Sequence, residues 1–192
     1  MKYHNLLLNA LKNGDVTRKT VISGPHVGDE ALYSNTALLW GSCDAAGGEV
    51  LEERLQTDVE LVVCGGGHIA LELVAFASRL GYRITVIDER EQYCNNTRFC
   101  GAQCVCAPFD QALDGEHGWI RPYFVIATRG HSYDQLCLQK ILDLNHRYIG
   151  MIGSKSKVAA TFENLRNLGF SQAQLDQVHS PIGLDIGAVT AG

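Results

Sequence analysis

The sequence predicts an α/β protein built on a doubly wound parallel sheet, with a small β-rich unit before it. Two observations carry this prediction. Short apolar runs of strand length recur from residue 59 onward, and segments with apolar residues at helical spacing separate them. Strands that alternate with helices of this length are typical of a parallel sheet with right-handed crossover connections.

The first 58 residues form the predicted N-terminal unit and carry weaker signals. Residues 19–23 and 37–40 have strand character, and the turn-forming residues 44–48 predict a loop. Residues 49–55 are expected to form a short helix. Because regular alternation begins only at residue 59, we place the boundary between a 1–58 unit and a 59–192 domain there.

The elements of the second domain follow in order. The expected strands are 59–64, 82–88, 123–128 and 148–152, with a further short strand near Val105. The expected helices are 69–80, 133–144 and 155–168, with Gly81 and Gly169 as C-terminal caps of the first and last.

Composition excludes several classes of protein. The chain has 192 residues, 46% of them hydrophobic, and a formal net charge of -5. No stretch approaches the roughly 18 apolar residues of a membrane span, and no export signal is visible, so a cytoplasmic protein is expected. The negative charge gives no reason to expect nucleic acid as a partner. The seven cysteines are expected to be reduced thiols.

The strongest chemical signal is the turn Gly65-Gly66-Gly67, which joins the first strand of this domain to its first helix. With Ala70 it completes the pattern G-x-G-x-x-A of Rossmann dinucleotide-binding domains, in which glycines let the backbone approach a pyrophosphate. The helix N-terminus, with His68 and Ile69 in its first turn, favours the negative charge. We therefore predict a nucleotide site at residues 65–69.

Asp88 ends the next strand, 21 residues after Gly67. That spacing is close to the one at which a carboxylate accepts hydrogen bonds from the ribose of NAD. Arg90 complicates the assignment, because an arginine there could receive the 2′-phosphate of NADP or pair with Asp88 or Glu91. NAD is the favoured cofactor of this pattern.

The segment Thr128-Arg129-Gly130-His131 follows the third long strand, so its polar groups are expected at the same edge of the sheet as the glycine turn. His131 could act as a general base or ligand, with Asp134 orienting it or capping the next helix. An ordinary loop histidine with a capping aspartate fits these residues equally well.

A second phosphate site is predicted where Gly153, Ser154 and Lys155 open the last helix. The alternative is a Ser-capped helix start with solvated lysines, since the G-x-x-x-x-G-K-[ST] frame of a P-loop is absent. Near the chain end, Asp185 is a further candidate polar group for the cleft.

Four cysteines, Cys94, Cys100, Cys104 and Cys106, lie within one short segment. Their spacing does not contain the C-x2-C pairs of structural zinc sites, and Cys104 and Cys106 on one strand would share a face. Packing is the favoured interpretation, and we predict no metal site.

Several blocks taken in order resemble the Rossmann domain of the xanthine dehydrogenase accessory protein family, XdhC/CoxI. The resemblance spans about residues 59 to 190. The blocks are Cys64 to Ala70, Val86 to Arg90, Thr97-Arg98-Phe99, Thr128 to His131, Tyr148 to Lys155 and Pro181 to Ala188.

The resemblance implies a protein that binds the molybdenum cofactor and assists its maturation and insertion into a molybdenum hydroxylase such as xanthine dehydrogenase. Such a protein is a cofactor chaperone more than a catalyst, and a homodimer is possible. The alternatives are an NAD(P)-dependent oxidoreductase, with His131 and Asp134 as its candidate catalytic residues, and a dinucleotide-sensing regulatory domain. The oxidoreductase alternative lacks a substrate domain.

Two departures from the family pattern accompany the resemblance. The family's N-terminal domain is usually longer than residues 1–58, so we expect this unit to be a shortened one. The chain also stops at Gly192, where the family usually continues into another helix. We therefore expect the domain to be truncated or completed by a partner subunit.

Overall fold

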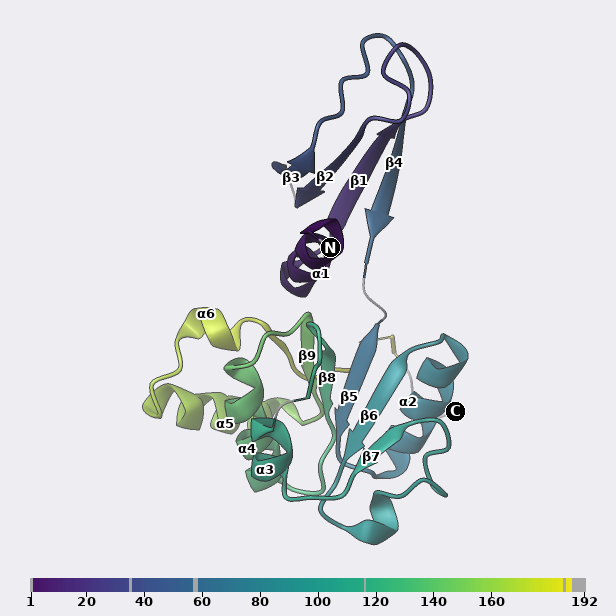
Figure 1. The fold of residues 1–192 in the computed structure, drawn as a ribbon. Helices are drawn as coiled ribbons and strands as arrows, with labels where there is room; N and C mark the ends of the chain where they lie inside the picture. Colours follow the sequence, from purple (N-terminus) through teal and green to yellow (C-terminus); the bar gives the residue numbers. More distant parts are fainter. Residues whose placement is uncertain (1, 35, 57–58, 116, 185, 188–192) are drawn as a thin grey trace. The chain divides into compact units, whose positions relative to one another are not determined.

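The computed structural model describes residues 2–34, 36–56, 59–115, 117–184 and 186–187. It divides into two compact units, residues 1–58 and 59–192. Both units are drawn in Figure 1.

The first unit is a helix followed by a four-stranded antiparallel sheet of order β3-β2-β1-β4. Its elements are α1 (Lys2–Asn13), β1 (Val16–Val21), β2 (Glu30–Ser34), β3 (Ala37–Gly41) and β4 (Val50–Leu55). The sequence did not predict α1. The small β-rich character of the unit agrees with the sequence prediction.

The helix predicted for residues 49–55 is wrong, because this segment is strand β4. All six residues of β4 pair with β1, and opposite charges face each other across the pair. Arg18 lies 2.8 Å from Glu53, and Lys19 pairs with Glu52. Cross-strand pairing of this kind outweighs the helical propensity of a seven-residue segment that is too short to be stable as an isolated helix.

The second unit is a six-stranded, wholly parallel sheet of order β10-β9-β8-β5-β6-β7. Its strands are β5 (Glu60–Cys64), β6 (Arg83–Ile87), β7 (Gln103–Val105), β8 (Tyr123–Ile126), β9 (Tyr148–Met151) and β10 (Val178–His179). In chain order along the sheet this is 3-2-1-4-5-6 read from β7, the order of a Rossmann domain. The predicted fold class is confirmed.

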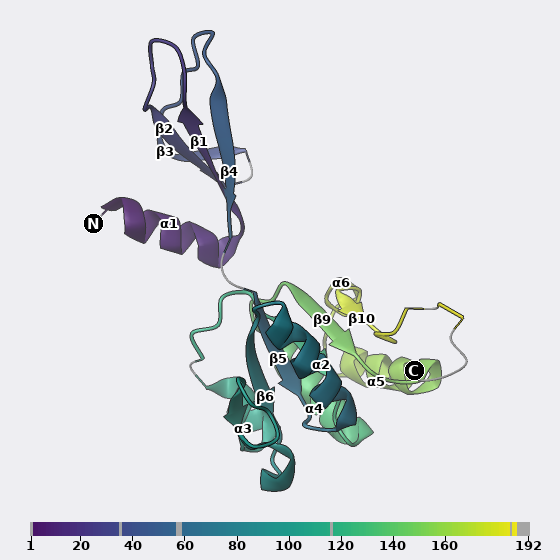
Figure 2. The same cartoon turned by 90° about the vertical axis from the view of Figure 1, so that its right-hand side faces the viewer.

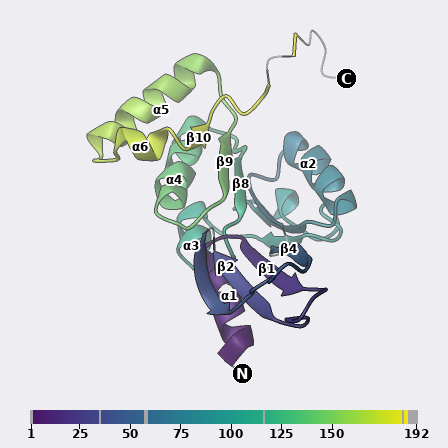
Figure 3. The ribbon, with the colours of Figure 1, turned by 90° about the horizontal axis from the view of Figure 1, so that it is seen from above.

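The helices of this unit cover both faces of the sheet. They are α2 (His68–Arg79), the short 3-10 helix η1 (Glu91–Tyr93), α3 (Phe109–Asp114), α4 (His131–Leu142), α5 (Lys155–Asn167) and α6 (Gln172–Leu175). Figures 2 and 3 show α2 on the opposite face from α4 and α5. Two separate apolar clusters correspond to these faces, one built on α2 and the other on α3, α4 and α5.

Strand β5 is central and wholly buried, as its uninterrupted apolar run predicted. Helix α4 begins two residues earlier than predicted, directly after Gly130. The short elements α3, α6 and β10 were not predicted, because segments of two to six residues carry too few apolar positions to show a period.

Candidate functional site

The candidate site lies at the carboxyl edge of the parallel sheet, where β5 adjoins β8. The chain order of the strands reverses between these two neighbours, and ligands of open α/β sheets bind in the crevice at such a point. The turn Gly65–Gly67 leaves β5 there, and Thr128 follows β8. The predicted glycine turn and the predicted 128–131 loop therefore lie at neighbouring strand ends.

The first two glycines of the turn are required by its backbone geometry. Gly65 has a φ of 111°, and a Cβ atom there would collide with the carbonyl oxygen of Ala127. A Cβ atom at Gly66 would collide with the carbonyl oxygen of Tyr93. Both positions hold the turn tightly against neighbouring backbone, so larger residues would displace it.

Gly67 differs from its two neighbours because it opens onto space. A Cβ atom there would have no heavy atom within 4 Å apart from those of Gly67 and its two chain neighbours. Gly67 is the N-cap of α2, and no side chain caps this helix, so the orphan N–H groups of the first turn have no side-chain partner at the cap. His68 and Ile69 in that turn are exposed. This is the geometry of an anion-binding helix N-terminus.

The peptide groups of Gly66 are held from both sides. Its N–H donates to Asp88 Oδ2 at 2.9 Å, and its carbonyl oxygen accepts from Arg98 Nε at 3.0 Å. Arg98 Nη2 is buried without a hydrogen-bond partner. The orientation of the turn is therefore set by two charged side chains before any ligand arrives.

Asp88 is only 2% exposed, and its carboxylate is held by Arg90 as well as by the turn. Arg90 Nε and Nη2 each donate to one carboxylate oxygen at 2.8 Å, and the Arg90 N–H adds a bond of 3.0 Å. Burial acts to raise the pKa of Asp88, but the hydrogen bonds from Arg90 and Gly66 outweigh it and hold this pKa below its ordinary value. Asp88 is thus a buried anion that supports the turn.

Arg90 was expected either to receive the 2′-phosphate of NADP or to pair with Asp88 or Glu91. The structure shows the ion pair with Asp88. The guanidinium carbon also lies 3.9 Å from the centre of the Tyr93 ring. The ribose contact of Asp88 stays a prediction, since hydrogen bonds from Gly66 and Arg90 already reach both carboxylate oxygens.

An ion pair that the sequence reasoning missed crosses the end of β5. Glu89 follows β6 and Arg129 follows β8, the two strands that flank β5. Glu89 Oε1 accepts from Arg129 Nη2 at 2.5 Å and from the Tyr133 hydroxyl at 2.8 Å. The Arg129 side chain is 46% exposed, so it is accessible to a ligand as well as to Glu89.

The predicted partnership of His131 and Asp134 is not the one observed. Asp134 Oδ1 accepts from the Thr128 hydroxyl at 2.6 Å and from the Thr128 N–H at 3.3 Å. Burial raises the pKa of Asp134, and the Thr128 hydrogen bonds partly offset this. The predicted cap is wrong as well, because Gly130 is the N-cap of α4 and no side chain caps it.

His131 contacts α5 instead. Its Nδ1 lies 3.3 Å from Thr161 Oγ1, which donates its own proton to the Lys157 carbonyl oxygen at 3.0 Å. A neutral ring that donates from Nδ1 to Thr161 would carry its lone pair on Nε2, whereas the opposite tautomer would accept from Thr161.

Helix α5 begins with a serine cap at Ser154, which was the alternative to a second phosphate site. Ser154 Oγ accepts from the Lys157 N–H at 3.4 Å, and Lys155 is exposed. Because α5 follows β9, its N-terminus lies at the same edge of the sheet as those of α2 and α4. A phosphate contact at Gly153, Ser154 or Lys155 stays a prediction, and Asp185 lies outside the described residues.

The four clustered cysteines differ in burial, with Cys94 buried, Cys104 half-buried and Cys100 and Cys106 exposed. Cys94 is buried, its Sγ lies 3.4 Å from the Val86 carbonyl oxygen, and burial raises its pKa to about 11. Cys104 is half-buried, whereas Cys106 follows the end of β7 and is exposed. Among the residues that the structure describes, no three His, Cys, Asp or Glu side chains are grouped to hold a metal ion.

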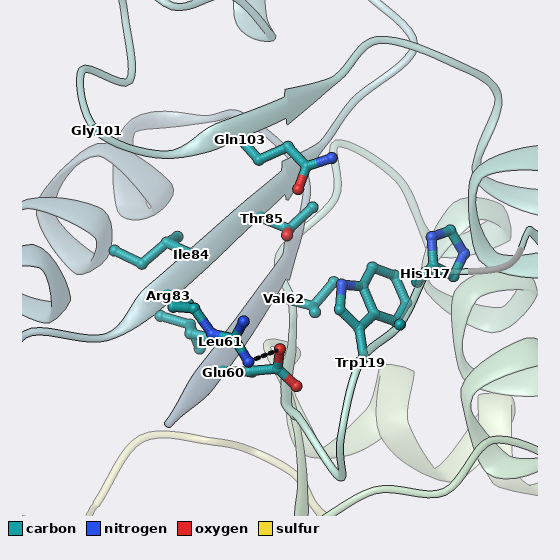
Figure 4. Close-up of a pocket in the computed structure, with 11 residues that line it drawn as sticks. Glu60, Leu61, Val62, Arg83, Ile84, Thr85, Gly101, Gln103, His117 and Trp119 are labelled. Atoms are coloured by element: carbon teal, nitrogen blue, oxygen red, sulfur yellow. Dashed lines mark hydrogen bonds and ion pairs between the residues drawn. The ribbon is translucent and has the colours of Figure 1, made fainter. Parts of the chain in front are cut away.

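A second feature lies at the opposite, amino edge of the sheet. A cavity of about 310 Å³ is bounded by Glu60, Arg83, Trp119 and His117, with Thr85 and Gln103 above them (Figure 4). The buried Glu60 carboxylate lies 2.7 Å from Arg83 Nη2 and accepts from the Ile120 N–H. Sequence reasoning singled out none of these residues.

Residues 61–192 match the XdhC Rossmann domain. The chain belongs to the XdhC family. An uncharacterized protein of Escherichia coli K12, YqeB, is 28% identical over 136 residues, which are 68% of this chain and 24% of that protein. A probable xanthine dehydrogenase subunit of Bacillus subtilis 168 is 26% identical over 137 residues, 71% of this chain and 39% of that protein.

Among solved structures, a crystal structure of a xanthine dehydrogenase from Bacillus halodurans superposes with a TM-score of 0.71 at 22% identity. The match covers 96% of this XdhC-family chain and 59% of the other. This likeness shows the fold. The chain spans between about a quarter and two fifths of the length of the two curated relatives. Across the described residues no helix is both long and apolar enough to span a membrane.

Proposed function

We propose that the carboxyl edge binds a phosphate-containing cofactor, either a dinucleotide or the molybdenum cofactor, and that the chain assists maturation of a molybdenum hydroxylase. The single observation that carries the proposal is the open, uncapped N-terminus of α2 at Gly67. A side chain at Gly65 or Gly66 would collide with backbone, whereas Gly67 borders open space in which a phosphate group would fit.

The residues present fit a phosphate or pyrophosphate group. The N–H groups at the N-terminus of α2 would hold it, and Asp88 and Arg98 keep the Gly66 peptides in the orientation that presents them. Arg129 would add a positive charge on leaving Glu89, and Lys155 lies at the start of α5 on the same edge. Both cofactors carry a phosphate group, which this edge would bind through the α2 N-terminus.

Membership of the XdhC family and the names of two similar proteins support a xanthine dehydrogenase-type partner. In this role the bound cofactor supplies the redox chemistry of the hydroxylase after transfer. The chain itself would bind the phosphate end, orient the cofactor and release it. None of these steps requires a substrate pocket of its own.

The first test is calorimetric titration of the protein with NAD, NADP and isolated molybdenum cofactor. Arg129→Gln removes a charge at the crevice, while Lys140→Gln removes one from the ion pair with Asp114 and serves as the matched control. We expect molybdenum cofactor binding that Arg129→Gln weakens about tenfold and Lys140→Gln leaves unchanged.

Other results would redirect the assignment. Binding of a dinucleotide alone would overturn the cofactor-chaperone function. Hydride transfer to a carbonyl or alcohol would then favour an oxidoreductase in which His131 Nε2 takes or gives the proton. Binding without turnover would favour a dinucleotide sensor.

A further inference from the structure

The cavity at the amino edge of the parallel sheet is lined by polar side chains from several segments. Among them are Thr85 of β6, Gln103 of β7 and Trp119 (Figure 4). Within the described part of the chain, the Thr85 hydroxyl, the Gln103 amide and the Trp119 indole N–H form no hydrogen bond. Thr85 is only 7% exposed. Because a hydroxyl this enclosed normally has a hydrogen-bond partner, Thr85 points to a molecule bound in the cavity.

The aromatic wall of this cavity is held in place before any ligand arrives. The Trp119 and His117 rings stack with their centroids 3.7 Å apart, and the Phe124 ring meets Trp119 edge-on at 5.7 Å. The N–H of Ile120, the next residue along the chain, donates to the buried Glu60 carboxylate. A wall fixed in this way adds little ordering cost when a ligand binds.

The cavity has no unbalanced charge. Among its lining residues, all of which the structure describes, Glu60 and Arg83 carry opposite charges and lie 2.7 Å apart. Burial lowers the pKa of His117, so this ring is uncharged near pH 7. Since a buried ion needs a counter-charge, this lining favours an uncharged ligand over a phosphate or an ammonium ion.

We propose that this cavity binds a small, uncharged, polyhydroxylated molecule of about the size of one sugar ring. Each hydroxyl of such a molecule can both donate and accept a hydrogen bond. It can accept from the Thr85 hydroxyl or the Trp119 N–H and donate to the Glu60 carboxylate, while the Gln103 amide serves either role. The volume of about 310 Å³ is at the lower end for ligand pockets and suits one ring rather than a dinucleotide.

The distribution of the polar groups favours a polyol over a flat heterocycle. Glu60, Thr85 and Gln103 belong to three neighbouring strands, β5, β6 and β7, and Trp119 lies in a separate segment after α3. A polyol carries hydroxyls around its whole carbon skeleton and so matches groups spread over several walls. A heterocycle presents its polar groups only in the plane of its ring.

The polyol site is separate from the proposed cofactor site. Glu60, Arg83 and Gln103 are the first residues of β5, β6 and β7, whereas Gly67 follows the opposite end of β5. A ligand in the cavity would therefore not displace the cofactor. Gly67→Asp should leave polyol binding unchanged, so failure of one proposal leaves the other standing.

Two-dimensional 1H–15N NMR of the full chain tests the proposal through its two tryptophans. Trp119 lines the cavity, whereas Trp40 lies on β3 of the first unit and serves as an internal control, with Trp40→Phe assigning the two indole resonances. Titration with D-ribose, D-glucose and glycerol, each to about 50 mM, should shift the Trp119 resonance for at least one of them. We expect a dissociation constant on the order of 1 mM and no movement of the Trp40 resonance.

Two variants locate the binding in the cavity. Thr85→Val keeps the shape of its side chain, Gln103→Met keeps the length of its own, and each should weaken binding about twofold to tenfold by removing a hydrogen bond. Thr20→Val on β1 and Gln111→Met on α3 are the matched controls. Both controls should bind as the wild type does.

The proposal would be overturned by a Trp119 resonance that stays in place with every polyol or that moves together with the Trp40 resonance. Movement with adenine but with no polyol would instead identify a flat heterocycle as the ligand. Unchanged affinity in both Thr85→Val and Gln103→Met would place the binding outside the cavity. If Thr85→Val fails to fold, Gln103→Met carries this test alone, because Gln103 is exposed.

Discussion

Replacing Gly67 with aspartate should strongly weaken ligand binding without destabilising the protein. The new carboxylate would enter the space that we assign to a phosphate, where no heavy atom beyond Gly67 and its chain neighbours lies within 4 Å of the Cβ position. Two unit charges of like sign about 4 Å apart repel by about 4 kcal/mol at an effective dielectric constant near 20. Binding of NAD or molybdenum cofactor should therefore weaken by about 100-fold to 1000-fold.

The same substitution should leave the free protein as stable as the wild type or slightly more so. Gly67 has φ and ψ of -69° and -169°, which aspartate adopts without strain, and it is the uncapped N-cap of α2. Aspartate at this position accepts a hydrogen bond from the first turn and interacts favourably with the helix dipole. The gain is a few tenths to about 1 kcal/mol, which raises the Tm by about 1–4 °C.

Calorimetric titration and thermal unfolding of one preparation measure both effects. Ala75→Asp, an equal charge change at an exposed site on the same helix, is the control and should bind normally. Gly66→Asp should lower the Tm, because its side chain collides with the Tyr93 carbonyl. Unchanged ligand affinity in Gly67→Asp would refute the placement of the phosphate at α2, and a marked loss of stability would refute the description of Gly67 as an open N-cap.

Three further predictions follow from particular contacts. Glu89→Gln should strengthen binding of anionic ligands several-fold at low salt, because it removes the negative charge that competes for Arg129 and leaves an acceptor for the Tyr133 hydroxyl. Unchanged affinity in a calorimetric titration would show that Arg129 does not contact the ligand. Burial lowers the pKa of His117 below its ordinary value of about 6.5, so the unfolded state binds more protons below that pH and stability should fall as pH drops through it. His117→Phe, which can retain the stacking on Trp119, should flatten the dependence of unfolding free energy on pH between about pH 7 and 5.5, whereas parallel curves for the two proteins would contradict this assignment. Iodoacetamide near neutral pH should label the exposed Cys100 and Cys106 well before the buried Cys94 and Cys137, as followed by peptide mass spectrometry; early labelling of Cys94 would mean that its raised pKa and burial do not protect it.

The fold of residues 59–192 could be predicted because its strands are buried on both faces. Such strands read as uninterrupted apolar runs, and the glycines after β5 mark where the first one stops. The N-terminal unit was harder to predict. Strand β4 is half-exposed and rich in charge, so its state depends on its pairing with β1 rather than on a local pattern.

The candidate site was predicted in part for a similar reason. Carboxyl ends of parallel strands share one edge, so Gly65, Asp88 and Thr128 could be placed together from the sequence alone. The contacts of Glu89 and Arg98 could not, because each joins residues more than 30 positions apart through irregular segments. The Thr97-Arg98-Phe99 block of the family resemblance was the signal that could have drawn attention to Arg98.

The central position of β5 affects how the chain is made as well as what it binds. Its two edges are completed by β6, which follows within about 20 residues, and by β8, which follows about 60 residues later. At ribosomal rates of about 5–20 residues per second, the backbone N–H and C=O groups along one edge of β5 stay unpaired for about 3–12 s while the intervening segment is synthesised. The corresponding delay in the first unit is about half as long, since β1 is completed by β4 about 30 residues after it ends. The nascent XdhC-family chain therefore passes through a period in which its N-terminal unit can fold while an open strand edge beside the glycine turn is available to chaperones or to aggregation.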